Sequence, residues 1–266
     1  MITKSVTLAR QLQPAKWVMS CLPRANVQQI ADLATFMPSG FAAYLRVLHP
    51  AAFRPAWSGA VDPAEAIRWA DLADANGVRL HAEIAFQQIL SPSELSHRGE
   101  LEPMSGALVP ESCAALVSLL GGHTATAAAC WFCLWEGNAG LWDQAKSQAD
   151  PAAASGKQTG GDTTIPSIQD DLLASYPKVD MGSRRYFLGH GPLGAACLLY
   201  DEIGASPNIW WPEDHAWIVV TEVDSYSTYV GCDRAAAGDI LASPDLESIE
   251  VDLGVRIDLG DGAPGW

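Results

Sequence analysis

The sequence has no uninterrupted apolar run of the ~18 residues that a membrane-spanning helix needs. It is also poor in basic residues: 16 Lys and Arg stand against 31 Asp and Glu, which gives the 266-residue chain a net charge of −15. A surface of that sign repels nucleic-acid phosphates and anionic lipids. We therefore expect no nucleic-acid partner and no membrane, whereas a basic protein partner or a small ligand is compatible with the charge.

The six cysteines are too scattered for a disulfide framework. The N-terminal residues include Lys and Arg, but Gln, Pro and Lys interrupt any apolar centre, so no secretion signal is indicated. These two absences predict reduced thiols and a cytoplasmic protein. The sequence also lacks a Walker motif, a Gly-x-Ser-x-Gly elbow and a redox-cofactor fingerprint, and we therefore expect no cofactor.

Helical patterns are concentrated before residue 130 and strand patterns after it. Helices are predicted at 26–36, 62–77, 81–90, 109–123 and 233–243. Strands are predicted at 41–50, 78–80, 130–137, 184–192, 208–212, 216–224, 227–232 and 248–253. This order predicts an α+β fold of a single domain over residues 1–266, with helices packed on one face of a mostly antiparallel sheet.

Two segments fit neither pattern. Residues 143–183 contain Tyr176 as their only aromatic residue and are rich in small and polar types, which predicts a flexible insertion. Residues 252–266 are rich in Gly and Asp, and we expect them to fray as a C-terminal tail.

One pair of short motifs suggests zinc chemistry. His81-Ala82-Glu83 is followed by Cys130 and Cys133 in a Cys-x-x-Cys, and zinc-dependent deaminases use this combination. In such an enzyme the histidine and both cysteines hold the zinc ion, while the glutamate moves a proton between the metal-bound water and the base. His81, Cys130 and Cys133 are therefore candidate metal ligands, and Glu83 is a candidate catalytic residue.

The sequence around the two cysteines disagrees with that hypothesis. Deaminases place the Cys-x-x-Cys in the first turn of a helix, where residues i and i+3 share a face. Here Trp, Phe and Leu surround the cysteines and "EGNAG" follows at once, which favours a strand. On a strand, residues i and i+3 point to opposite faces, so the pattern favours two buried thiols over a metal site.

The densest stretch of the chain is "WWPEDHAWIVVTEVDSYSTYVGC", residues 210–232. A turn with carboxylates and an imidazole, followed by two carboxylates on the next strand, could bind a divalent metal or perform acid–base chemistry. The alternative is a solvated hairpin turn beside core tryptophans. The candidate binding residues are Trp210, Trp211, Glu213, Asp214 and His215. Glu222 and Asp224 are further candidate catalytic residues that share one face of the strand and are expected at a sheet rim or cleft.

Three stretches, "CWFCLWEG", "SPNIWWPEDHAWIVVTEVDSYSTYVGC" and "ILASPDLESIEV", resemble a group of uncharacterised actinobacterial proteins. The shared patterns are CWFxLWEG and SPNxWWPEDxAWxVxTExDxxSTYVG, and the resemblance covers residues 38–142 and 184–251. It implies no function and no catalytic residues. In that group the position of residues 81–83 is not a fixed His-x-Glu, which counts against the deaminase hypothesis.

The sequence therefore favours a non-catalytic binding or regulatory protein with an acidic surface, including an immunity-type role against a basic partner. The alternative is a metal-dependent hydrolase. It would use either the deaminase-like set His81, Glu83, Cys130 and Cys133 or the acidic set Glu213, Asp214, His215, Glu222 and Asp224.

Overall fold

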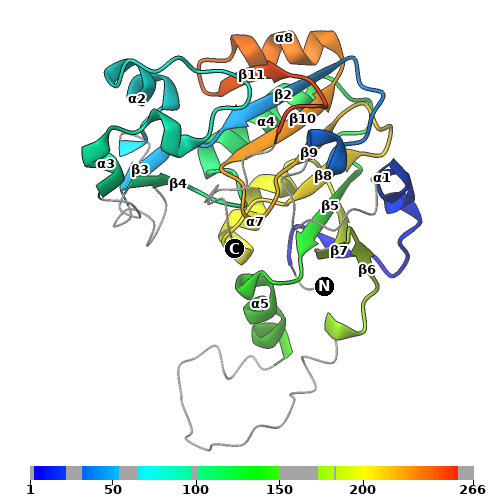
Figure 1. Ribbon diagram of the computed structural model, residues 1–266. Coiled ribbons are helices and arrows are strands. Elements are labelled where there is room, and N and C mark those ends of the chain that lie inside the picture. The colour runs from blue at the N-terminus through cyan, green and yellow to red at the C-terminus, as the bar shows by residue number, and fades with distance from the viewer. Residues whose placement is uncertain are drawn as a thin grey trace, which may run out of the picture.

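The computed structural model describes residues 3–21, 32–53, 65–96, 101–149, 173–182 and 184–256. Its strands are β1 (Thr7–Leu8), β2 (Ala43–Leu48), β3 (Ala51–Phe53), β4 (Leu101–Pro103), β5 (Cys130–Trp135), β6 (Lys178–Asp180), β7 (Arg185–Gly191), β8 (Ile209–Pro212), β9 (Ile218–Val220), β10 (Ser227–Cys232) and β11 (Glu247–Val251). Within the described residues, nine of them form one sheet in the order β1-β7-β5-β8-β9-β10-β2-β11, with β6 also paired to β7 (Figure 1). The pairings between these strands are antiparallel.

The helices are α1 (Lys16–Cys21), α2 (Trp69–Ala75), α3 (Pro92–Ser96), α4 (Pro110–Gly121), α5 (Ala139–Ala149), α7 (Ala195–Ile203) and α8 (Arg234–Ala242). The apolar faces of the four longest, α4, α5, α7 and α8, pack against one face of the sheet. The opposite face is covered by α1, by a 3₁₀ turn at Leu33–Thr35 and by the segment that follows β11. The α+β class and the mostly antiparallel sheet with helices on one face are thus confirmed, with a thinner layer on the other face.

A smaller unit extends from one end of β2 (left in Figure 1). It contains α2, α3, the β3–β4 pair and a 3₁₀ turn at Phe86–Ile89. Its core forms around Trp69 and Phe86, whose rings lie 5.1 Å apart. No helix in the described part of the chain is both long and apolar enough to cross a membrane.

The predicted meander is confirmed, because β8, β9 and β10 are neighbours in both chain and sheet. The strand at 41–50 joins this sheet from far away in sequence, and β2 lies between β10 and β11. The C-terminal strand is an edge strand, as predicted. The predicted Asp233 cap of α8 is also present, since its Oδ1 accepts a hydrogen bond from the Ala236 amide at 2.8 Å.

Several local predictions were wrong. The helix predicted at 62–77 begins only at Trp69, because Ile67 instead forms a β-bridge with Ala51; residues 54–64 lie outside the described residues. Its end is correct, since Gly77 follows it with a φ of 67°. The strand at 78–80 is absent, and 81–90 forms only a 3₁₀ turn. The helix α7 was not predicted at all.

Both segments predicted to be irregular include regular or packed residues in their described parts. Helix α5 continues to Ala149, and β6 joins the sheet from Lys178, so the predicted insertion at 143–183 is wrong at both ends. Residues 150–172 and 183 lie outside the described residues. The tail predicted from 252 is also packed at its start, where Val255 is buried; residues 257–266 are outside the described residues.

Candidate functional site

The deaminase-like set does not come together. Cys130 lies in the core on the side of α4 and α7, whereas Cys133 lies in the core on the side of α1. His81 and Glu83 are exposed on the segment between α2 and the 3₁₀ turn. Among the described residues, no three His, Cys, Asp or Glu side chains are grouped so that they could hold a metal ion. The strand geometry expected from the sequence therefore separates the proposed ligands.

Cys130 and Cys133 should react slowly with a thiol reagent in the native protein. Burial raises the pKa of Cys130 to about 12 and raises that of Cys133 as well, so neither supplies a thiolate near neutral pH. Native alkylation followed by peptide mass spectrometry measures this, with the partly exposed Cys197 as internal reference. One zinc ion bound per chain through both cysteines would contradict the expectation.

The residues of the β8–β9 turn are engaged in holding the turn in place. The Asp214 carboxylate accepts hydrogen bonds from the Thr124 hydroxyl and the Ala125 amide, each at 2.8 Å. Desolvation raises the pKa of this carboxyl, but the hydrogen bonds outweigh it and lower the pKa overall. Glu213 accepts a hydrogen bond from the Trp131 indole. His215, with a φ of 55°, stacks on an indole of α1 at 4.3 Å between ring centres.

Glu222 and Asp224 both form ion pairs with one arginine, Arg184. Both were expected at a sheet rim or cleft: Asp224 is exposed, whereas Glu222 is only 4% exposed and lines a small cavity together with Arg184. Arg184 Nε lies 3.3 Å from Glu222 Oε1, and the same guanidinium also pairs with Asp224. Glu222 additionally accepts a hydrogen bond from the Asp224 amide at 2.6 Å. These carboxylates therefore fasten the segment after β9 to the start of β7.

The tryptophans proposed as binding residues lie in the protein core. Trp210 and Trp211 are both fully buried, one on each face of the sheet. Trp210 contacts Trp217 edge-on, with ring centres 5.4 Å apart. Neither ring presents a face on which a ligand could stack, so their role in this structure is packing.

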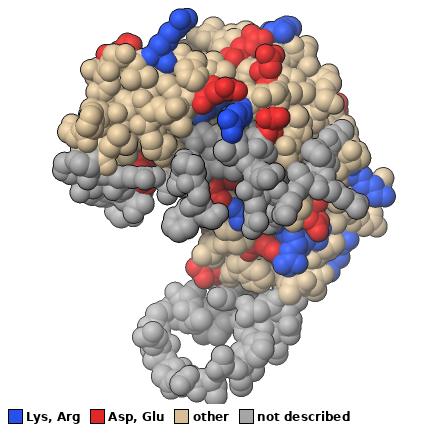
Figure 2. All heavy atoms as spheres, viewed as in Figure 1, with Lys and Arg blue, Asp and Glu red and all other residues tan. Residues whose placement is uncertain are grey.

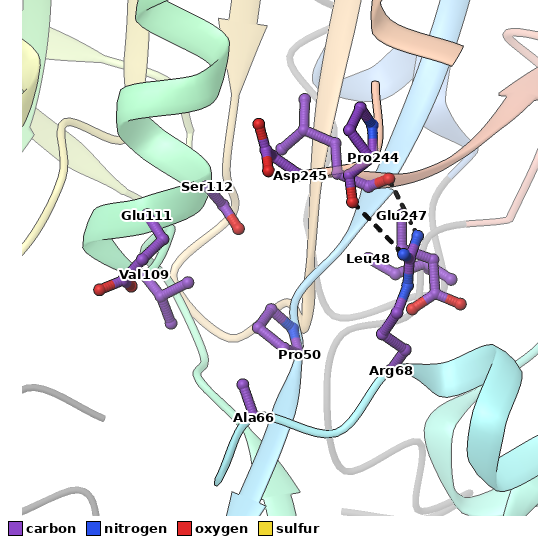
Figure 3. Close-up of a pocket in the computed structure, with 11 residues that line it drawn as sticks. Leu48, Pro50, Ala66, Arg68, Val109, Glu111, Ser112, Pro244, Asp245 and Glu247 are labelled. Carbon is purple, nitrogen blue, oxygen red and sulfur yellow. Dashed lines mark hydrogen bonds between the residues drawn. The ribbon is translucent and has the colours of Figure 1, made fainter. Parts of the chain in front are cut away.

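A cavity of about 270 Å³ opens between four segments that are distant in sequence (Figure 3). The segments are the end of β2, the residues before α2, the start of α4 and the loop between α8 and β11. Its apolar lining includes Leu48, Pro50, Val109 and Leu246. Sequence reasoning missed this site, because no local motif marks residues that only tertiary structure brings together.

One wall of the cavity joins α2 to the α8–β11 loop. Arg68 donates hydrogen bonds to the carbonyl oxygens of Pro244 and Leu246, at 3.4 and 3.1 Å (dashed in Figure 3). Glu247 accepts from the amides of Trp69 and its neighbour Ala70, at 2.8 and 2.7 Å. Burial raises the pKa of Glu247, and these amide hydrogen bonds oppose the shift.

Other residues of the lining also present polar side chains to the cavity. Ser112, on α4, is 6% exposed, and its hydroxyl points into the cavity without a hydrogen-bond partner in the described part of the chain (Figure 3). Glu111 and Asp245 are exposed residues of the lining. With Glu247 they make three carboxylates against the one guanidinium of Arg68, so the cavity carries an excess of negative charge.

Comparison of the chain with protein-family models, with curated proteins and with solved structures finds no match. The resemblance to the actinobacterial group stays a prediction.

Proposed function

We propose that this protein is a binding protein that accepts a small organic cation in the cavity between α4 and the α8–β11 loop. The observation that carries the proposal is the Ser112 hydroxyl, which has no hydrogen-bond partner within the described residues and is directed into a cavity with excess carboxylate. A hydroxyl that faces an open cavity can accept a hydrogen bond from a ligand, so a ligand donor is a natural complement of this group.

The volume and the lining of the cavity limit the class of ligand that fits it. Ligand pockets of proteins typically span ~300–1,000 Å³, and a cavity of about 270 Å³ lies at the small end. Leu48, Pro50 and Val109 offer apolar contact, while Glu111 and Asp245 offer negative charge. This combination suits an ammonium or guanidinium group on a short aliphatic stem.

Two sources could supply that chemistry: a free amine, or a Lys or Arg side chain of a basic protein partner. The second source agrees with the regulatory or immunity-type role expected from the charge of −15. Figure 2 shows acidic side chains at the top of the molecule, over α8 and β11. These elements and their loop carry Asp239, Asp245, Glu247 and Glu250, of which Asp239 pairs with His123 and Glu250 with Arg234. Such a field attracts a basic partner before contact.

Butylammonium should bind the native protein, while 1-butanol and butyrate of similar shape should bind more weakly or not at all. Calorimetry or chemical-shift titration measures the affinity. An exposed charge contributes roughly 0.2–1 kcal/mol. The double variant Glu111→Gln/Asp245→Asn should therefore weaken butylammonium binding by about two- to thirtyfold. Ser112→Val should weaken it as well, because the hydroxyl is lost without loss of volume.

Asp201→Asn is the matched control, since it removes an exposed carboxylate of α7 that does not line the cavity. A Lys-containing tripeptide with blocked ends separates the two sources: binding of the peptide at least as tight as that of butylammonium favours a protein partner. Equal affinity for butylammonium and 1-butanol, or an equal loss in Asp201→Asn, would show that the cavity is not a cation site.

A further inference from the structure

Two cysteines from different helices face one another. The Sγ atoms of Cys113 on α4 and Cys197 on α7 lie 4.0 Å apart. Cys113 is buried in the core, whereas Cys197 is partly exposed. A reagent in solution can therefore reach the sulfur of Cys197, while the sulfur of Cys113 is buried next to it.

The pair also differs from the other thiols in its electrostatics. The hydrogen-bonding contact between the two thiols lowers the pKa of Cys197 to about 7 and raises that of Cys113. Burial instead raises the pKa of Cys130 and of Cys232 to about 12. A thiolate rather than a thiol is the nucleophile, so Cys197 is the cysteine of this group that both ionises near neutral pH and meets solvent.

We propose that Cys113 and Cys197 form a thiol–disulfide exchange site that reacts with low-molecular-weight disulfides. The Cys197 thiolate attacks one sulfur of R–S–S–R; a mixed disulfide forms at Cys197, and the departing R–S⁻ takes a proton from water. The Cys113 sulfur then attacks Cys197 Sγ, and its proton passes to the second departing R–S⁻. Two protein thiols are thereby oxidised by two electrons to one disulfide, and R–S–S–R is reduced to two R–SH.

The second step requires only a local movement. A disulfide has an S–S distance of about 2.05 Å, so the sulfurs must approach by roughly 2 Å from their present 4.0 Å. Rotation of the two side chains and a small shift between α4 and α7 supply that approach. Ser112 precedes Cys113 on α4, so the disulfide forms beside the wall of the cavity, but the exchange chemistry does not depend on the cation site.

Oxidised glutathione is the probe. Every sample is the full chain with the background substitution Cys21→Ser, which removes a thiol whose side chain the structure does not describe. Peptide mapping without reduction should find Cys113 linked to Cys197 in the otherwise wild-type protein. In Cys113→Ala the second step is blocked, so one glutathione should remain attached to Cys197. In Cys197→Ala neither adduct nor cross-link should form, and Cys232→Ala, the matched control, should behave as wild type.

A second readout is the pH dependence of alkylation, measured on the native protein and on Cys113→Ala. The rate of native alkylation at Cys197 should rise with pH around a midpoint of about 7. In Cys113→Ala that midpoint should move up toward the ~8.5 of an unperturbed thiol. A stable glutathione adduct on Cys197 without cross-link in the wild type, or modification at Cys197 no faster than at the buried Cys133, would overturn the proposal.

Discussion

Replacing Trp217 with alanine should lower the free energy of unfolding by about 3–5 kcal/mol, a typical loss for a buried aromatic residue. Trp217 is fully buried between the sheet and α4. Its indole N–H donates to the Leu120 carbonyl at 3.0 Å, and its ring meets that of Trp210. The substitution opens a cavity and removes one donor from that carbonyl, which keeps the hydrogen bond from the His123 amide at 3.1 Å. Since a domain typically has ~5–15 kcal/mol of stability, the variant should be close to unfolding.

Urea unfolding followed by far-UV circular dichroism measures this loss, because that signal does not depend on the tryptophan that is removed. Trp131→Ala is the matched control: it removes the same side chain from a half-buried position on the opposite face of the sheet. Its cost should be clearly smaller. Similar costs for the two variants would contradict the assignment of Trp217 to the centre of the core.

The central strands were predictable because their sequence periodicity matches their burial. In β5, Cys130 and Phe132 face one core and Cys133 faces the other, as strict alternation requires. The same rule correctly separates the two cysteines. Helix α4 was likewise predictable, since Pro110 begins it and Gly121 ends it.

Elements whose form depends on distant partners were not predictable in this way. Trp69 begins α2, because Glu247, far away in sequence, binds the first amides of that helix and Ile67 is held in a bridge to Ala51. The local sequence predicted an earlier start for this helix, at the proline that follows residue 62. Tertiary contacts override local preference here, as they commonly do.

The same reason explains why the burial of Glu222 was not predictable. Alternation with Asp224 placed both carboxylates on one face, and a polar face usually indicates solvent. The sequence does not show that the half-buried Arg184, which precedes β7, pairs with Glu222. The cavity was even less predictable from the sequence, since its lining residues Ser112 and Asp245 lie more than a hundred residues apart in the chain.

A buried hydrogen-bonded chain runs beside the end of β2. His49 Nδ1 lies 2.6 Å from the Met104 carbonyl oxygen, which only accepts, so this nitrogen carries the proton. Nε2 then accepts from the Thr228 hydroxyl at 2.8 Å, and Thr228 accepts from Thr221 at 2.7 Å. His49 and both threonines are fully buried. This arrangement requires a neutral imidazole, because a protonated Nε2 would donate and the two hydroxyls would have to reverse their hydrogen bonds.

Stability should therefore fall as the pH is lowered from about 6.5 to about 4, through protonation of His49 in the unfolded chain. Burial lowers the pKa of His49 from 6.5 to about 4; the Met104 carbonyl opposes the shift and the nearby Arg46 adds to it. The folded-state pKa is depressed, so the unfolded state binds the proton first, and the stabilisation present above pH 6.5 is lost toward pH 4. At 1.36 kcal/mol per unit, a shift of this size corresponds to about 3 kcal/mol.

The comparison of wild type with His49→Asn isolates this effect from the many carboxylates that also titrate at low pH. Asparagine can still donate to Met104 but does not ionise, so the variant should be less stable than wild type at pH 7 by a margin that shrinks by about 3 kcal/mol at pH 4. Urea unfolding at each pH measures the margin. An NMR titration of the wild-type imidazole provides the direct check, and a ring that becomes protonated near pH 6.5 in the folded protein would show that His49 is not held neutral by its burial.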